Sequence, residues 1–67
     1  MIARLKENQT FKGFTQEKDY QYFDIYNIED GQLLFNFKSD DTGKPRKLNE
    51  REFTMNFRSK YSDQKFV

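Results

Sequence analysis

The chain must build its core almost entirely from aromatic rings. It has 67 residues and contains neither cysteine nor histidine, so neither a disulfide nor a zinc site with the usual nitrogen and sulfur ligands can brace the fold. A chain of this length removes only about 60% of its unfolded surface from water. Eight Phe and four Tyr make up about half of its apolar residues, and each ring can bury roughly 150–250 Å². The composition therefore predicts one small domain of modest stability.

The charge balance argues against disorder and against a strong electrostatic partner. Twelve basic and eleven acidic residues leave a net charge of +1, whereas disordered chains combine low hydrophobicity with high net charge and few aromatics. Such a balance produces no strong field for nucleic acid or an anionic membrane. The sequence has no apolar run of the roughly 18–20 residues that a membrane span needs, and no signal-peptide core. We therefore expect a cytoplasmic protein that does not contact a membrane.

The clearest predicted element is a β-hairpin. Residues 20–28 are rich in aromatic and β-branched types, and residues 32–38 alternate apolar with polar, which is typical of strands. Gly31 can take the left-handed conformation that a tight turn requires. A two-residue loop would place Tyr26 and Ile28 on the face of Leu33 and Phe35. A three-residue loop closed by a bulge at Gly31 is favoured, because it makes the centre of one face wholly apolar.

In the favoured register, Phe23 pairs with Phe37 and Ile25 with Phe35 on the inner face. Since strand side chains alternate, the residues on the outer face are then Tyr22, Tyr26, Ile28 and Leu34. An apolar outer face must be covered by another part of the chain, by a second copy or by a partner, and the sequence leaves these alternatives open. The candidate protein interface consists of Tyr20, Tyr22, Tyr26 and Leu34.

Shorter segments complete the predicted sheet. Residues 10–15 are expected to form a strand with a bend or bulge at Gly13. Residues 1–9, which include Ile2 and Leu5, are expected to cover one open end of the sheet. Residues 39–43 form a loop by composition. Residues 45–48 are expected to form a short edge strand, because proline is tolerated at a strand start.

A helix is predicted over about residues 50–58. Asn49 followed three residues later by Glu52 is a capping-box variant. Leu48 and Phe53 stand where a hydrophobic staple would stand, and Phe53 and Phe57 share one helix face. The predicted domain is therefore residues 1–58, and residues 59–67 form a polar, flexible tail.

The basic residues suggest a second kind of partner. The densest cluster is formed by Lys44, Arg46, Lys47 and Arg51. Together with exposed aromatics, such a cluster could bind a nucleic-acid backbone and stack bases. Acidic residues interleave with it, however, so solvated charge is the favoured interpretation and nucleic-acid binding is the alternative.

Enzyme chemistry is not expected. Asp41-Thr42-Gly43 matches the triplet of aspartic proteases, but those enzymes need two such carboxylates held on rigid apolar strands. Here the triplet lies in a polar loop, and Asp40 and Asp41 have no apolar surroundings in the sequence that would raise a pKa. We expect solvated turn residues, and no catalytic residue, cofactor or metal.

The pattern as a whole resembles small SH3-like β-barrel proteins of phages and prophages of low-GC bacteria. The resemblance covers about residues 5–58, and it rests on Leu5, Thr10-Phe11-Lys12-Gly13, Ile25, Ile28-Glu29-Asp30-Gly31, Phe35, Leu48-Asn49, Phe53 and Phe57. It implies a mainly β fold of three to four antiparallel strands with one short C-terminal helix. No functional residue is carried over, because one fold serves many partners.

The function predicted from these observations is protein binding without catalysis. Phage proteins of this size often bind and redirect host proteins, including bacterial defence systems, so the resemblance favours a small accessory module with a protein partner. A nucleic-acid-binding barrel is the first alternative. A structural homo-oligomer is the second, since small cores often gain stability by association.

Overall fold

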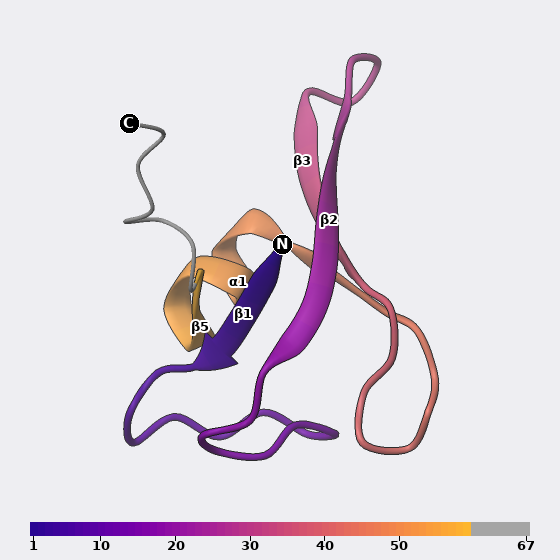
Figure 1. Cartoon of the computed structure of the whole chain (residues 1–67). Helices are drawn as coiled ribbons and strands as arrows, with labels where there is room; N and C mark the ends of the chain where they lie inside the picture. Colours follow the sequence, from indigo (N-terminus) through magenta and orange to yellow (C-terminus); the bar gives the residue numbers. More distant parts are fainter. Residues whose placement is uncertain (60–67) are drawn as a thin grey trace, which may run out of the picture.

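The computed structural model describes residues 1–59 as one antiparallel sheet with a short helix packed on one face (Figure 1). The order across the sheet is β4-β3-β2-β1-β5. The elements along the chain are β1 (Ile2–Leu5), β2 (Tyr20–Asn27), β3 (Gln32–Phe37), β4 (Arg46–Asn49), α1 (Glu50–Asn56) and β5 (Phe57–Ser59). The predicted mainly β class with one short helix is confirmed. The predicted barrel of three or four strands is not, because five strands form a sheet that stays open between β4 and β5.

The extra strands come from the two ends of the described chain. Residues 1–9, predicted to cover an open end, instead supply β1, which is inserted between β2 and β5. Ala3 and Leu5 of β1 are buried and alternate with half-buried neighbours. Four residues are too few for this alternation to stand out in the sequence.

The hairpin of β2 and β3 has neither of the two registers considered. Tyr22 pairs with Phe37, Asp24 with Phe35 and Tyr26 with Leu33, so the favoured pairing of Phe23 with Phe37 is wrong. The strands are joined by the four residues 28–31. Asn27 sets this loop: its carbonyl oxygen accepts the Gly31 N–H at 2.7 Å, and its side-chain oxygen accepts the N–H groups of Glu29 at 3.0 Å and Asp30 at 3.3 Å. Gly31 has the predicted left-handed conformation, with φ of 66°.

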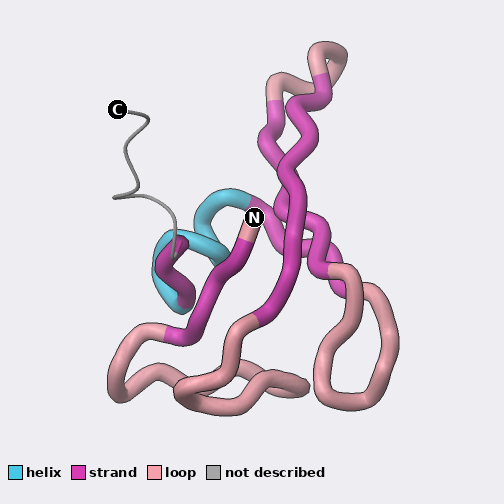
Figure 2. The backbone as a smooth tube through the Cα atoms, in the orientation of Figure 1, coloured by secondary structure: helices cyan, strands magenta, loops and turns pink. Residues whose placement is uncertain are grey.

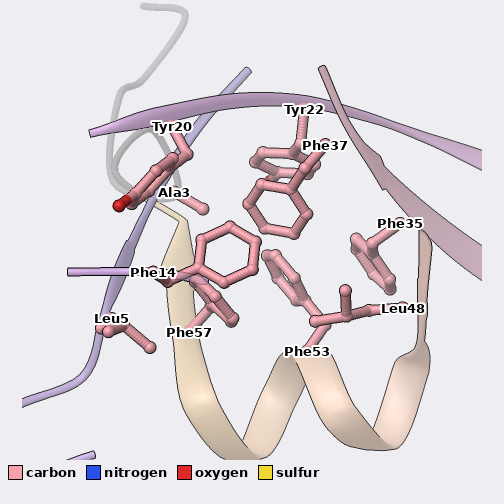
Figure 3. Packing of buried hydrophobic residues seen from close by; sticks show 10 residues of the cluster. All are labelled: Ala3, Leu5, Phe14, Tyr20, Tyr22, Phe35, Phe37, Leu48, Phe53 and Phe57. Carbon is pink, nitrogen blue, oxygen red and sulfur yellow. The ribbon is translucent and has the colours of Figure 1, made fainter. Parts of the chain in front are cut away.

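The core lies between the sheet and α1, and it consists largely of ring-to-ring contacts (Figure 3). Phe35 and Phe53 stack with their ring centroids 4.0 Å apart, and Phe14 packs edge-on against Phe57 at 5.0 Å. The buried apolar residues are Ala3, Leu5, Phe14, Tyr20, Tyr22, Phe35, Phe37, Leu48, Phe53 and Phe57. Every described element contributes at least one of them, so the aromatic core expected from composition is the feature that joins sheet and helix.

The helix begins where the sequence predicts and ends earlier. The Asn49 side chain accepts the Glu52 N–H at 2.7 Å, and the Glu52 side chain accepts the Asn49 N–H at 3.1 Å, so the capping box is confirmed. The helix stops at Asn56, not near residue 58, because Phe57 is extended and pairs with Leu5 of β1. Ser59 ends β5, whereas residues 60–67 of the predicted tail lie outside the described residues.

The segment between β1 and β2 contains a turn in place of the strand predicted at residues 10–15. Phe14 donates its N–H to the Phe11 carbonyl at 3.0 Å, which closes a four-residue turn. Gly13 is the third residue of this turn and has φ of 91°, the position at which one common turn type requires glycine. The turn directs Phe14 into the core, where its side chain is buried.

The hairpin tip and the long loops lie at opposite ends of the molecule (Figure 2). The segments before β2 and before β4 gather at one end, and the β2–β3 turn projects at the other, beyond β1 and α1 (Figure 1). Within residues 1–59, no helix is long and apolar enough to cross a bilayer.

Candidate functional site

The part of the hairpin that projects beyond the core carries an apolar surface. We call this surface the outer hairpin face and define it by Phe23, Ile25, Ile28 and Leu34. Ile25 lies opposite Leu34 and Phe23 lies opposite Asn36, and directly opposed residues of an antiparallel pair share one face. Phe23 is 46% exposed, Ile25 51% and Ile28 84%. Large apolar side chains therefore gather at one place on the surface.

The structure places the four predicted interface residues in two different environments. Tyr20 and Tyr22 are each only 4% exposed and belong to the core, so their assignment to a surface is wrong. Tyr26 is 60% exposed, but it lies on the sheet face that carries the core and reaches solvent because the hairpin tip extends beyond that core. Leu34 belongs to the outer hairpin face, where it is half-buried against its strand neighbours. Tyr26 and Leu34 are the two predicted interface residues that line a groove on this face.

A shallow groove, open to solvent, runs along the outer hairpin face. Ile25, Ile28 and Leu34 form its apolar side, while Asn36, Lys47 and Glu29 supply polar groups. Apolar centres with a polar rim are the usual composition of protein interfaces. The groove therefore has the chemistry of a contact surface for another polypeptide.

The predicted basic cluster is divided by the structure. The Arg46 guanidinium donates to the Asp40 carboxylate at 3.0 Å and to the Lys12 carbonyl at 2.8 Å. It also lies over the Phe14 ring, 5.2 Å from the centroid. Lys44, Lys47 and Arg51 are exposed, and Lys47 belongs to the hairpin groove. Arg46 is therefore a structural residue, and three of the four cations remain for an external anion.

Asp40 is buried and not a solvated turn residue as predicted. One carboxylate oxygen accepts the Thr42 hydroxyl at 2.6 Å and the Thr42 N–H at 2.8 Å, and the other accepts Arg46. The Thr42 hydroxyl is the largest cause that holds the pKa of Asp40 below its ordinary value, and Arg46 adds to it. Asp40 thus closes its own loop and positions Arg46 against the aromatic core.

Asp41 joins three segments of the chain. Its carboxylate accepts the Thr15 hydroxyl at 2.6 Å, the Tyr20 hydroxyl at 2.6 Å and the Lys18 ammonium at 3.0 Å. These bonds, Thr15 first, lower the pKa of Asp41 to about 2. Burial, followed by the bond to Asp41, raises the pKa of Tyr20. Both carboxylates are ionised at neutral pH and engaged by internal donors, so they stabilise the loops and offer no general acid.

A pH prediction follows from Asp41. Its carboxyl has a pKa of about 2 in the fold against 3.8 ordinarily, so its stabilising effect is complete above about pH 4 and is lost between about pH 4 and pH 2. We expect the wild-type thermal midpoint to fall over this interval and the Asp41→Asn variant to fall less steeply. Asp24→Asn, which changes an aspartate outside this cluster, is the control and should keep the wild-type slope. If the thermal midpoint of all three proteins fell equally steeply between pH 4 and pH 2, the role assigned to Asp41 would be contradicted.

No protein-family model, no curated protein and no solved structure matches this chain.

Sequence reasoning missed Phe23 and Ile25 as surface residues because both alternating sets of residues in β2 are apolar. Tyr20, Tyr22 and Tyr26 form one set, and Phe23 and Ile25 form the other. Ile28 and Leu34, by contrast, lie on the outer face of the hairpin as predicted. Asn27 is the signal that could have decided between them, since asparagine at the start of a turn bonds to backbone groups two and three residues on. A loop of residues 28–31 that follows Asn27 turns the tyrosines toward the face that carries the core, where Tyr20 and Tyr22 are buried.

Proposed function

We propose that this protein is a non-catalytic binding module that contacts a partner protein through the outer hairpin face. The observation that carries the proposal is the exposure of Phe23, Ile25 and Ile28 on one projecting hairpin. Solvent-exposed apolar side chains that cluster, with polar residues around them, mark interaction sites more often than chance. A projecting hairpin can also reach into a concave surface of a partner.

The rest of the surface supports this choice. The Asp40 and Asp41 carboxylates are engaged inside the fold, and Arg46 is held by Asp40. Nucleic-acid binding is the weaker proposal, because only Lys44, Lys47 and Arg51 remain of the predicted contact. An SH3-like kinship, a phage or prophage source and a cytoplasmic location are further proposals, and they rest on the resemblance and on the composition of the chain.

The proposal is tested by comparing three tagged proteins as baits in a lysate of a low-GC bacterium. The hairpin variant is Phe23→Ser combined with Ile25→Ser. The matched control is Met55→Ser, which removes an apolar side chain of similar exposure, 55%, from α1. Because aromatic and branched anchors at interface centres each carry a factor of roughly 30 or more in affinity, the wild type and the control should retain a partner that the hairpin variant loses.

Circular dichroism of the three baits shows whether each is folded to the same extent. The same proteins retained equally by all three baits, or no specific protein retained by any, would contradict the proposed function.

A further inference from the structure

One edge of β2 presents backbone groups that no described strand of residues 1–59 pairs with. Tyr22 exchanges two bonds with Met1: its N–H donates to the Met1 carbonyl at 2.8 Å, and its carbonyl accepts the Met1 amino group at 3.1 Å. Alternate residues of a strand direct their backbone groups to the same side. The N–H and C=O groups of Asp24 and Tyr26 therefore point to the side of β1, beyond the point where β1 begins.

Bonds on the other side of β2 confirm this alternation. The carbonyl of Gln21 accepts the Lys38 N–H, and the carbonyl of Asn27 accepts the Gly31 N–H. Odd-numbered residues of β2 thus bond toward β3 and even-numbered residues bond away from it. The open part of the edge runs from residue 23 to residue 27, between Met1 and the hairpin turn.

The two outer edges of the sheet, β4 and β5, have features that prevent the addition of another strand. The open edge of β2 lacks them. β4 follows Pro45 and carries Arg46 and Lys47, and β5 has three residues with Arg58 at its centre. Short length, proline and basic side chains are the usual means by which sheets prevent edge pairing. Residues 23–27 contain no Lys, Arg or Pro, and Asp24 is their one charged residue.

We propose that this edge pairs with the same edge of a second copy, in an antiparallel arrangement with two-fold symmetry. Ile25 lies on the symmetry axis, opposite Ile25 of the second copy. Asp24 then lies opposite Tyr26 of the second copy, and Phe23 opposite Asn27. Each Asp24 and Tyr26 exchanges both backbone bonds with its counterpart, so four hydrogen bonds join the two chains.

The geometry of the edge fits this register. A two-fold contact must present the same surface twice. When Ile25 lies on the axis, every residue of the open stretch 23–27 lies opposite a residue of the same stretch in the second copy. The incoming strand ends at Asn27, opposite Phe23, so it leaves the sheet where Met1 already occupies the place beside Tyr22. The register also keeps the two Asp24 carboxylates from facing each other directly, and a net charge of +1 per chain opposes association only weakly.

The pairing would join two five-stranded sheets into one and bring the two outer hairpin faces side by side. Ile25, 51% exposed in the monomer, gains a cross-strand apolar neighbour at the distance where such pairs interact. The outer hairpin faces stay accessible, so this inference does not depend on the proposed function. The contact is small, and we expect a dissociation constant of about 10–1,000 µM.

Sedimentation equilibrium of the full chain over a wide concentration range tests the proposal. Asp24→Pro removes one N–H that points to the open edge while keeping the bonds between β2 and β3, and proline is tolerated on such an edge. Asp24→Ala is the matched control, because it removes the same carboxylate and keeps the N–H. The wild type and Asp24→Ala should dimerise alike, whereas Asp24→Pro should dimerise about 10–100-fold more weakly.

A wild type that stays monomeric, or an Asp24→Pro variant that dimerises like the wild type, would overturn the proposal. Amide hydrogen exchange of the wild type provides a test that does not depend on the folding of any variant. The Asp24 and Tyr26 amides should be protected at high protein concentration and exchange rapidly on dilution. Protection that does not change with concentration would mean that something within the same chain covers the edge, and it would also overturn the proposal. Because Asp24 is not part of the outer hairpin face, partner capture and dimerisation can fail independently.

Discussion

Phe37→Ala is expected to lower the free energy of unfolding by about 3–5 kcal/mol, the usual cost of truncating a fully buried Phe. Phe37 is 1% exposed, and its ring lies within 6 Å of those of Phe14, Tyr22 and Phe57. The single core of a domain this small rarely supplies more than about 3–5 kcal/mol of stability. Most of the Phe37→Ala protein should therefore be unfolded or close to unfolding at room temperature.

The matched control is Phe23→Ala in the other strand of the same hairpin. Phe23 is 46% exposed and lies outside the core, so its truncation should cost about 1 kcal/mol or less. Urea denaturation followed by circular dichroism measures both. If Phe23→Ala were as destabilising as Phe37→Ala, the outer hairpin face would be part of the core and the proposed contact surface would not exist.

Gly13→Ala is expected to cost about 2–4 kcal/mol, because two penalties coincide there. Gly13 has φ of 91°, which an L-residue adopts only with strain. A Cβ at this position would also lie 2.5 Å from Nη1 of Arg46 and 3.0 Å from Oδ2 of Asp40. The substitution therefore displaces the Arg46 guanidinium, which pairs with Asp40 and also donates to the Lys12 carbonyl in the Gly13 turn.

Gly43→Ala separates the two penalties. Gly43 has φ of 85°, but a Cβ there would have no neighbour within 4 Å, so only the backbone strain of about 1–2 kcal/mol applies. Thermal or urea denaturation of both variants measures the difference. Equal losses of stability would show that the contact between Gly13, Arg46 and Asp40 does not form as described.

The helix start was predictable because its signal is local. The side chains of Asn49 and Glu52 bond to each other's backbone groups three residues apart, and these bonds need no other part of the chain. The end of the helix was not predictable in this way. Phe57 has the right spacing from Phe53 to continue the helix, and the two rings do stack, but pairing with Leu5 of β1 makes Phe57 extended. A contact between residues so far apart in sequence leaves no trace in local spacing.

The hairpin shows how much of the candidate site could be predicted from the sequence. The two strands and the left-handed Gly31 follow from composition and turn chemistry. The register does not, because β2 carries apolar residues on both faces and a shift of one residue exchanges those faces. What decides the register is the position of the core, and it draws Tyr20 and Tyr22 against Phe14 and Phe53.

The burial of Asp40 and the bonding of Asp41 were missed for a related reason. Asp40 and Asp41 look like solvated turn residues when only their sequence neighbours are considered. Their partners Arg46, Tyr20 and Thr15 come from other segments. These bonds join the loop that contains Asp41 to β2 and to the segment before β2. No local sequence pattern encodes such contacts.

The register of β2 against β3 is the claim on which the outer hairpin face depends, and a nuclear Overhauser spectrum in D₂O tests it directly. In an antiparallel pair, the Cα atoms of opposed residues approach to about 4.5 Å where the pair is not hydrogen-bonded, and their Hα atoms then give strong cross-peaks. The register described here predicts Hα cross-peaks between Asp24 and Phe35 and between Tyr26 and Leu33. Cross-peaks between Ile25 and Phe35, with none between Asp24 and Phe35, would place the tyrosines outside and contradict the account.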